Sequence, residues 1–75
     1  MSYLKIDTMK IKEFIRRLRR AGVTIVAHRS GSSHQMAYFG DKKTPVPVHE
    51  SQDYDNGFLR DICKQLGLDP REIVR

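Results

Sequence analysis

The sequence predicts an α+β domain in which one helix is followed by three strands and a second helix. Apolar residues recur at helical spacing within residues 8–21 and again within residues 55–67. The segment between them is rich in β-branched and alternating residues, with turn-forming residues at its breaks. Because the connections are short and each helix has one apolar stripe, we expect a three-stranded antiparallel sheet with both helices on one face.

The first helix is predicted to begin at Thr8, a suitable N-cap, and to end at Gly22. Its apolar stripe follows the i, i+3, i+4, i+7 pattern at Ile11, Phe14, Ile15 and Leu18. The opposite face is mostly basic and carries Lys12, Glu13, Arg16, Arg17, Arg19 and Arg20. Such a run is most often a solvated face, but the scarcity of acidic partners favours the docking of an anion.

Three strands are predicted, at residues 23–29, 34–39 and 44–49. The turns between them are Ser30-Gly31-Ser32-Ser33 and Gly40-Asp41-Lys42-Lys43. In the third strand Pro45 and Pro47 are two residues apart, so their missing N–H groups fall on the same side. This pattern predicts an edge strand with Val46 and Val48 facing inward.

A polar, acidic loop over residues 50–55 precedes the second helix, which Asp55 is expected to cap and Gly67 to end. Its predicted apolar face consists of Phe58, Leu59, Ile62, Cys63 and Leu66. Asp69-Pro70 predicts a cap and the first residue of a short last turn. The whole order is that of a double-stranded-RNA-binding domain, although the lysine cluster that usually opens the second helix of that domain is absent.

Length and composition exclude several classes of protein. Seventy-five residues allow one small domain with a thin core. The single cysteine, Cys63, excludes an internal disulfide and a cysteine-based zinc cage, and its place on an apolar face predicts a core residue. No apolar run approaches the ~18 residues of a membrane span, and the first seven residues are too polar for a signal peptide. We therefore expect a cytosolic domain.

The net charge of +5 is unevenly distributed. Residues 1–29 hold eight basic and two acidic groups, whereas residues 30–75 hold six and seven. An excess confined to the first third predicts a polyanionic partner, and the alternative is a merely soluble basic surface. The expected phosphate contacts are Lys10, Lys12, Arg16, Arg20 and Arg29, with Lys42 and Lys43 as further contributors.

Of the three histidines, His34 is the best candidate for chemistry. It follows Gly31-Ser32-Ser33, whose hydroxyl and backbone N–H groups are suited to holding a phosphate oxygen. An imidazole with a pKa of about 6.5 moves protons near neutral pH, which suits RNA cleavage by the 2′-hydroxyl. The alternative is a surface histidine in a hairpin. No histidine pair has helical i, i+4 spacing, so no metal site is predicted.

From Met9 onward the sequence resembles the HicA family of bacterial toxins, small ribonucleases of type II toxin–antitoxin systems. Met9–Phe14 resembles the start of the family's sequences, and Gly31–His34 its Gly-Ser-x-His motif. Val46–His49 resembles the third-strand motif, and Gly57–Leu68 the last helix. Each piece alone is weak, but four in order at the right spacings are fairly specific.

This resemblance implies a fold like that of a double-stranded-RNA-binding domain and cleavage of mRNA without metal or cofactor. It also implies neutralisation by a cognate HicB antitoxin in the bacterial cytoplasm, and it places the catalytic histidine on His34. Residues 9–75 would form the ribonuclease domain, and residues 1–8 would extend it. Many members have a second histidine and then an aromatic residue where this chain has Gln35 and Met36.

Two other functions are compatible with the same residues. A non-catalytic RNA-binding module would use the basic helix to bind RNA in a salt-dependent way, without cleaving it. An interaction protein would dock only an acidic protein partner, and would bind RNA no better than an inert basic protein does. A cleavage assay discriminates the first from the enzyme, and an RNA-binding assay discriminates the second.

Overall fold

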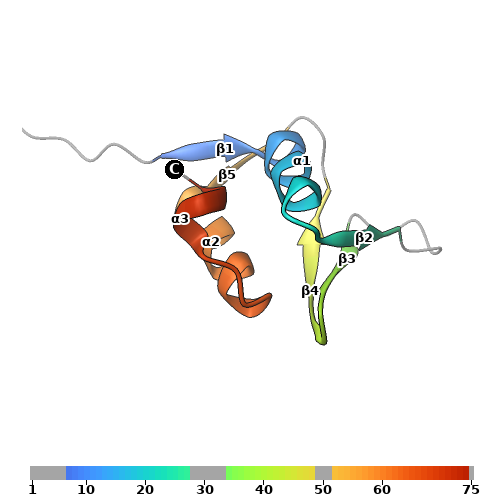
Figure 1. The fold of residues 1–75 in the computed structure, drawn as a ribbon. Helices are drawn as coiled ribbons and strands as arrows, with labels where there is room; N and C mark the ends of the chain where they lie inside the picture. Colours follow the sequence, from blue (N-terminus) through green and yellow to red (C-terminus); the bar gives the residue numbers. More distant parts are fainter. Residues whose placement is uncertain (1–6, 28–33, 49–51, 75) are drawn as a thin grey trace, which may run out of the picture.

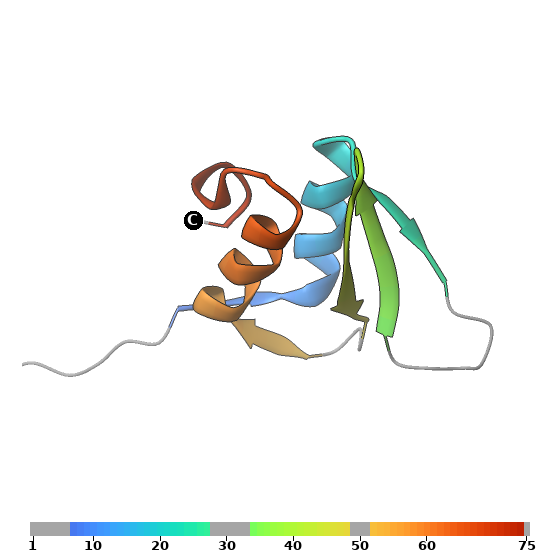
Figure 2. The same cartoon turned by 90° about the horizontal axis from the view of Figure 1, so that it is seen from below.

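The computed structural model describes residues 7–27, 34–48 and 52–74. Both long helices lie on one face of a three-stranded antiparallel sheet, which confirms the predicted α+β architecture (Figures 1 and 2). The elements in chain order are β1 (Thr8–Lys10), α1 (Ile11–Arg20), β2 (Thr24–Val26), β3 (His34–Phe39), β4 (Lys42–Pro47), β5 (Asp53–Asp55), α2 (Asn56–Gln65) and α3 (Pro70–Ile73).

The main sheet has the order β2-β3-β4, so the proline-containing strand β4 lies at an edge, as predicted. The bounds of β3 are those predicted, but β4 begins at Lys42 rather than at residue 44. The reason is a tighter turn: Phe39 pairs with Lys42, and Gly40 and Asp41 alone connect the strands. Gly40 has a φ of 63°, which a two-residue hairpin turn accepts from glycine at its first central position.

The first strand of this sheet is shorter than the predicted 23–29, because β2 covers only Thr24–Val26 and residues 28–29 lie outside the described part of the chain. The side chain of Val46 is fully buried, as expected for an inward position. Val48 is only half-buried.

A second, two-stranded sheet was not predicted. β1 pairs antiparallel with β5, and Thr8 lies opposite Asp55. Thr8 is therefore a strand residue, and its predicted role as the cap of α1 is wrong; the helix begins at Ile11 without a side-chain cap. The carbonyl of Gln52 accepts from the Ile11 N–H at 3.2 Å instead, so backbone pairing replaces the missing cap. The predicted loop over residues 50–55 is likewise corrected, since its last three residues form β5.

Both long helices end in the same motif, and the two glycines predicted as stops lie just beyond their last turns. Gly22 and Gly67 have positive φ, 103° and 78°. The Val23 N–H donates to the Leu18 carbonyl at 3.0 Å, and the Leu68 N–H to the Cys63 carbonyl at 2.9 Å. These six-to-one bonds are those of a Schellman motif, which satisfies the last helical carbonyls.

The predicted caps of α2 and α3 are confirmed. The Asp55 carboxylate accepts from the Gly57 N–H at 2.9 Å, and the Asp69 carboxylate accepts from the Arg71 N–H at 3.0 Å. Pro70 occupies the first position of α3, where its missing N–H costs nothing.

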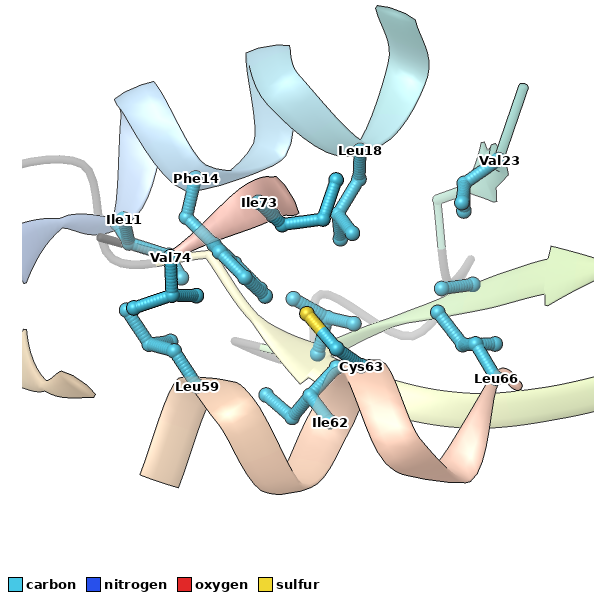
Figure 3. Packing of buried hydrophobic residues seen from close by; sticks show 12 residues of the cluster. Ile11, Phe14, Leu18, Val23, Leu59, Ile62, Cys63, Leu66, Ile73 and Val74 are labelled. Atoms are coloured by element: carbon cyan, nitrogen blue, oxygen red, sulfur yellow. The ribbon is translucent and has the colours of Figure 1, made fainter. Parts of the chain in front are cut away.

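The core lies between the helices and the sheet (Figure 3). Phe14 of α1 is its largest fully buried side chain and points toward Cys63 of α2. Burial raises the pKa of the Cys63 thiol to about 11, so this group stays protonated near neutral pH, in agreement with a core role. Phe58 was also expected on the apolar face, but its side chain is 46% exposed and its ring stacks on Tyr54 with centroids 5.8 Å apart.

One chain of polar contacts ties α1 to α3. The Glu13 carboxylate accepts from Arg16 at 2.7 Å and from Arg17 at 3.0 Å. Arg17 then donates from Nη1 to the Ile73 carbonyl at 2.8 Å. The hydrogen bonds from Arg16 and Arg17 lower the pKa of Glu13 below its ordinary 4.5. Glu13 thus holds two arginines and, through one of them, the C-terminal helix.

Removing the cap of α2 should destabilise the domain. We expect Asp55→Ala to lower the free energy of unfolding by about 1 kcal/mol, because the Gly57 N–H loses its acceptor. Asp55→Asn keeps an acceptor and should lower the free energy of unfolding by only about a few tenths of a kcal/mol. Urea denaturation of the three proteins measures both values. An equal loss in the two variants would assign the effect to the negative charge rather than to the hydrogen bond.

The contribution of Glu13 should depend on pH. Its folded-state pKa is lowered, so the stabilisation is present above the unfolded value near 4.5 and is lost as pH falls through the folded value. We expect Glu13→Gln to lower the Tm at neutral pH, and the difference from wild type to shrink in acid. Thermal denaturation of both proteins across a pH series measures this difference in Tm. Other acidic groups titrate in both proteins, so their effect cancels in the difference. A difference that stays constant from pH 7 to acid would contradict the assignment.

Candidate nucleic-acid interface

The burial of one stripe of α1 divides the remaining side chains of this helix into two groups. Ile11, Phe14 and Leu18 lie in the core. At 100° per residue, positions 12, 16 and 19 then fall on one flank, and positions 13, 17 and 20 on the other. The charged residues of α1 therefore form two stripes with different surroundings.

The first flank lines a groove of about 450 Å³ between α1 and the adjoining ends of β3 and β4. We call it the α1 groove. Its lining consists of Ile11, Lys12, Ile15, Arg16, Arg19, Gln35 and Val48. The three cations come from α1 at i, i+4 and i+7, and among the residues that the structure describes the lining includes no carboxylate. A groove of this size whose described charges are all positive is suited to an anionic ligand.

His34 is the first residue of β3, and its backbone lies opposite Pro47 in the sheet register. The next residue, Gln35, lies opposite Val46 and lines the α1 groove. Position 34 is therefore one residue from the groove along β3, and successive strand positions alternate between the two faces of the sheet. The side chain of His34 lies outside the described part of the chain, as do all of Arg29, Gly31, Ser32 and Ser33. The roles expected of these residues stay predictions.

The second flank faces a smaller hollow of about 360 Å³ toward α3. Arg17 and Arg20 line it together with Glu13 and Glu72, and Arg16, at the boundary between the two flanks, lines both this hollow and the α1 groove. Its two carboxylates make it less suitable for a polyanion than the α1 groove. Arg20, which the charge pattern also assigns to phosphate binding, lies among the residues of this hollow and not among those of the groove.

The remaining predicted phosphate contacts are scattered. Lys10 lies 3.7 Å from Asp53 across the β1–β5 pair, so it has an acidic partner. Lys42 and Lys43 lie at the turn end of the β3–β4 hairpin, about five residues or 16 Å along the strand from position 34. Arg29 lies outside the described residues, and of the other six basic residues predicted to contact phosphate Lys12 and Arg16 line the α1 groove.

Sequence reasoning missed two polar residues of this groove, Arg19 and Gln35. Arg19 follows Lys12 by seven residues, so helical periodicity alone was sufficient to place both on one stripe. Gln35 carries no such signal, because only the packing of β3 against α1 brings it to the helix.

The described residues contain no group of three histidine, cysteine, aspartate or glutamate side chains that could hold a metal ion. Within the same residues, no helix is long and apolar enough to cross a membrane.

Comparison with known proteins identifies the family. The chain matches the family model described as HicA toxin of bacterial toxin–antitoxin over residues 11–68, well over half of its 75 residues. No curated protein and no solved structure matches it. The matched segment runs from the first residue of α1 to just beyond α2, so it includes the whole three-stranded sheet and every residue of the α1 groove. This chain belongs to the HicA toxin family of bacterial toxin–antitoxin systems.

Proposed function

We propose that this protein is the toxin of a HicA–HicB pair and acts as a metal-independent endoribonuclease on mRNA. The observation that carries the proposal is the position of His34 at the start of β3, one residue along the strand from a groove whose described charged residues are all cationic. Membership of a toxin family supports the same conclusion. Cleavage of mRNA would stop translation and growth in the bacterial cytoplasm.

In this mechanism the substrate supplies its own nucleophile. The 2′-hydroxyl attacks the adjacent phosphorus as its proton passes to a base, and the bond to the 5′-oxygen breaks as that oxygen takes up a proton. The products are a 2′,3′-cyclic phosphate and a 5′-hydroxyl end. His34 is proposed as the general acid or base of this exchange. Gly31, Ser32 and Ser33 are proposed to orient the phosphate through N–H and hydroxyl groups, and Arg29 is proposed to contact the phosphate backbone.

The antitoxin is proposed to be a HicB-type protein that covers the cationic surface. An acidic partner seated over Lys12 and Arg16 would compete directly with phosphate groups, and long-range attraction would speed its association. Covering the start of β3 at the same time would block His34. Neutralisation therefore needs no change in the fold of the toxin.

His34→Ala should lower the rate of RNA cleavage by about 10²- to 10⁴-fold and leave RNA affinity nearly unchanged. The assay is a time course on a labelled single-stranded RNA with EDTA present, with a third lane for RNA carrying a 2′-deoxy sugar at the cut site. His28→Ala is the matched control, since it removes an imidazole from a position with no proposed role.

Three outcomes would contradict the proposal. Cleavage by His34→Ala at the wild-type rate would show that the site is wrong. Binding without cleavage by the wild type would identify a non-catalytic RNA-binding module. A parallel loss of Tm, affinity and activity in His34→Ala, with His28→Ala intact, would make His34 a structural residue.

A further inference from the structure

The lining of the α1 groove has two chemically different parts. Lys12, Arg16 and Arg19 are exposed along its α1 side. Beneath them the groove has an apolar floor, made by the buried Ile11 and by Ile15 and Val48, which are half-buried. Gln35 adds one amide, from β3. A surface that only attracted a phosphate backbone would need the cations, but it would have no use for the apolar surface that the half-buried Ile15 and Val48 leave accessible.

We propose that the α1 groove binds an unpaired nucleotide of single-stranded RNA. In this arrangement the base lies against the apolar floor, the flanking phosphates contact Lys12 and Arg19, and the Gln35 amide contacts the edge of the base. The proposal rests on the proposed function in one respect, that the polyanion is RNA. It adds direct contact with an unpaired base and assigns roles to Arg19 and Gln35.

The charge balance within the groove selects Arg19 and Lys12 as the phosphate contacts. Arg16 already donates from Nε and Nη2 to Glu13, at 3.2 and 2.7 Å. Within the described residues, Lys12 and Arg19 have no ion pair. Two cations seven residues apart lie about two helical turns, or 10.5 Å, apart along the axis. They therefore offer two separate points of contact to a backbone that follows the helix.

The apolar floor selects an unpaired base. In an RNA duplex the bases are stacked and paired inside the helix, so a protein contacts mostly phosphates and 2′-hydroxyls. An unstacked base can turn its face onto an apolar surface and its edge toward a polar side chain. The Gln35 amide provides both a donor and an acceptor for that edge. The groove thus distinguishes this domain from a binder of double-stranded RNA, although the fold is similar.

The test measures binding without cleavage, in proteins that carry His34→Ala. The probe is a fluorescein-labelled 12-nucleotide single-stranded RNA. Adding Arg19→Gln should weaken binding by about 3- to 10-fold and reduce the slope of log affinity against log salt by about 0.7. Lys64→Gln is the matched control, because it removes an exposed cation from α2. Arg20→Gln should resemble the control, since Arg20 lies outside the groove.

Two further probes test the base. An abasic oligomer of equal length keeps every phosphate, and we expect it to bind about 5- to 50-fold more weakly than the RNA with little change in salt slope. A 12-base-pair RNA duplex should also bind more weakly, despite its greater charge. Gln35→Ala should reduce the differences in affinity among the four homopolymers A, C, G and U.

Equal affinity for the abasic oligomer and the RNA would overturn base binding. If Arg19→Gln changes RNA affinity no more than Lys64→Gln does, RNA does not bind in the α1 groove. The groove would then be a site for an acidic protein partner. If Arg20→Gln weakens RNA binding as much as Arg19→Gln does, RNA contacts the whole basic face of α1 and not the groove alone. These outcomes do not depend on cleavage: if the wild type never cuts RNA but Arg19→Gln weakens binding, the proposed enzyme is wrong and the groove stands.

Discussion

The burial of Phe14 between α1 and α2 is the constraint on which the rest of the structure depends. A domain of this size has one thin core, and its largest fully buried side chain comes from the middle of α1. Replacing a buried phenylalanine by alanine typically costs about 3–5 kcal/mol, a large part of the stability of so small a domain. Because Phe14 must face α2, the rotation of α1 about its axis is set. That rotation turns Lys12, Arg16 and Arg19 toward the ends of β3 and β4, and Glu13 and Arg17 toward α3.

The parts of this fold that were predictable from sequence are those with strong local signals. The helical stripe around Phe14, the glycine stops and the Asp55 cap are each readable within a few residues, and all three match the structure. The β1–β5 pair was missed because three-residue strands have too short a pattern, and because their pairing joins segments some 45 residues apart. The Thr8 error has the same cause: a good capping residue was instead used in a strand, and tertiary pairing overrode local preference.

The candidate site was predictable in composition but not in arrangement. The charge count correctly pointed to α1 as a cationic helix, yet a count cannot say which side of a helix each charge occupies. Arg19 and Arg20 are adjacent in sequence but line different hollows, because each residue of an α-helix is rotated by 100° about the axis from the one before it. Lys42 and Lys43 were expected as phosphate contacts in the turn before the third strand. The tight hairpin puts them at the far end of the sheet from position 34. Gln35 enters the groove only through packing between elements.

The two flanks of α1 have different roles. One makes contacts that stabilise the fold, and the other presents the cations that line the α1 groove. Like-charged neighbours such as Lys12 and Arg16 repel each other across one turn, a cost of about 0.2–0.5 kcal/mol per pair. Glu13 offsets part of this repulsion on its own flank by holding Arg16 and Arg17. On the groove flank Lys12 and Arg19 have no ion pair within the described residues, so part of the repulsion between Lys12 and Arg16 remains in the free protein. A polyanion seated there would relieve it, and a ligand that binds only the folded state raises stability by an amount that grows with the logarithm of its concentration above Kd. The groove flank is thus the part of α1 that gains most from a bound polyanion, whether that is the proposed RNA or an acidic surface of the proposed antitoxin.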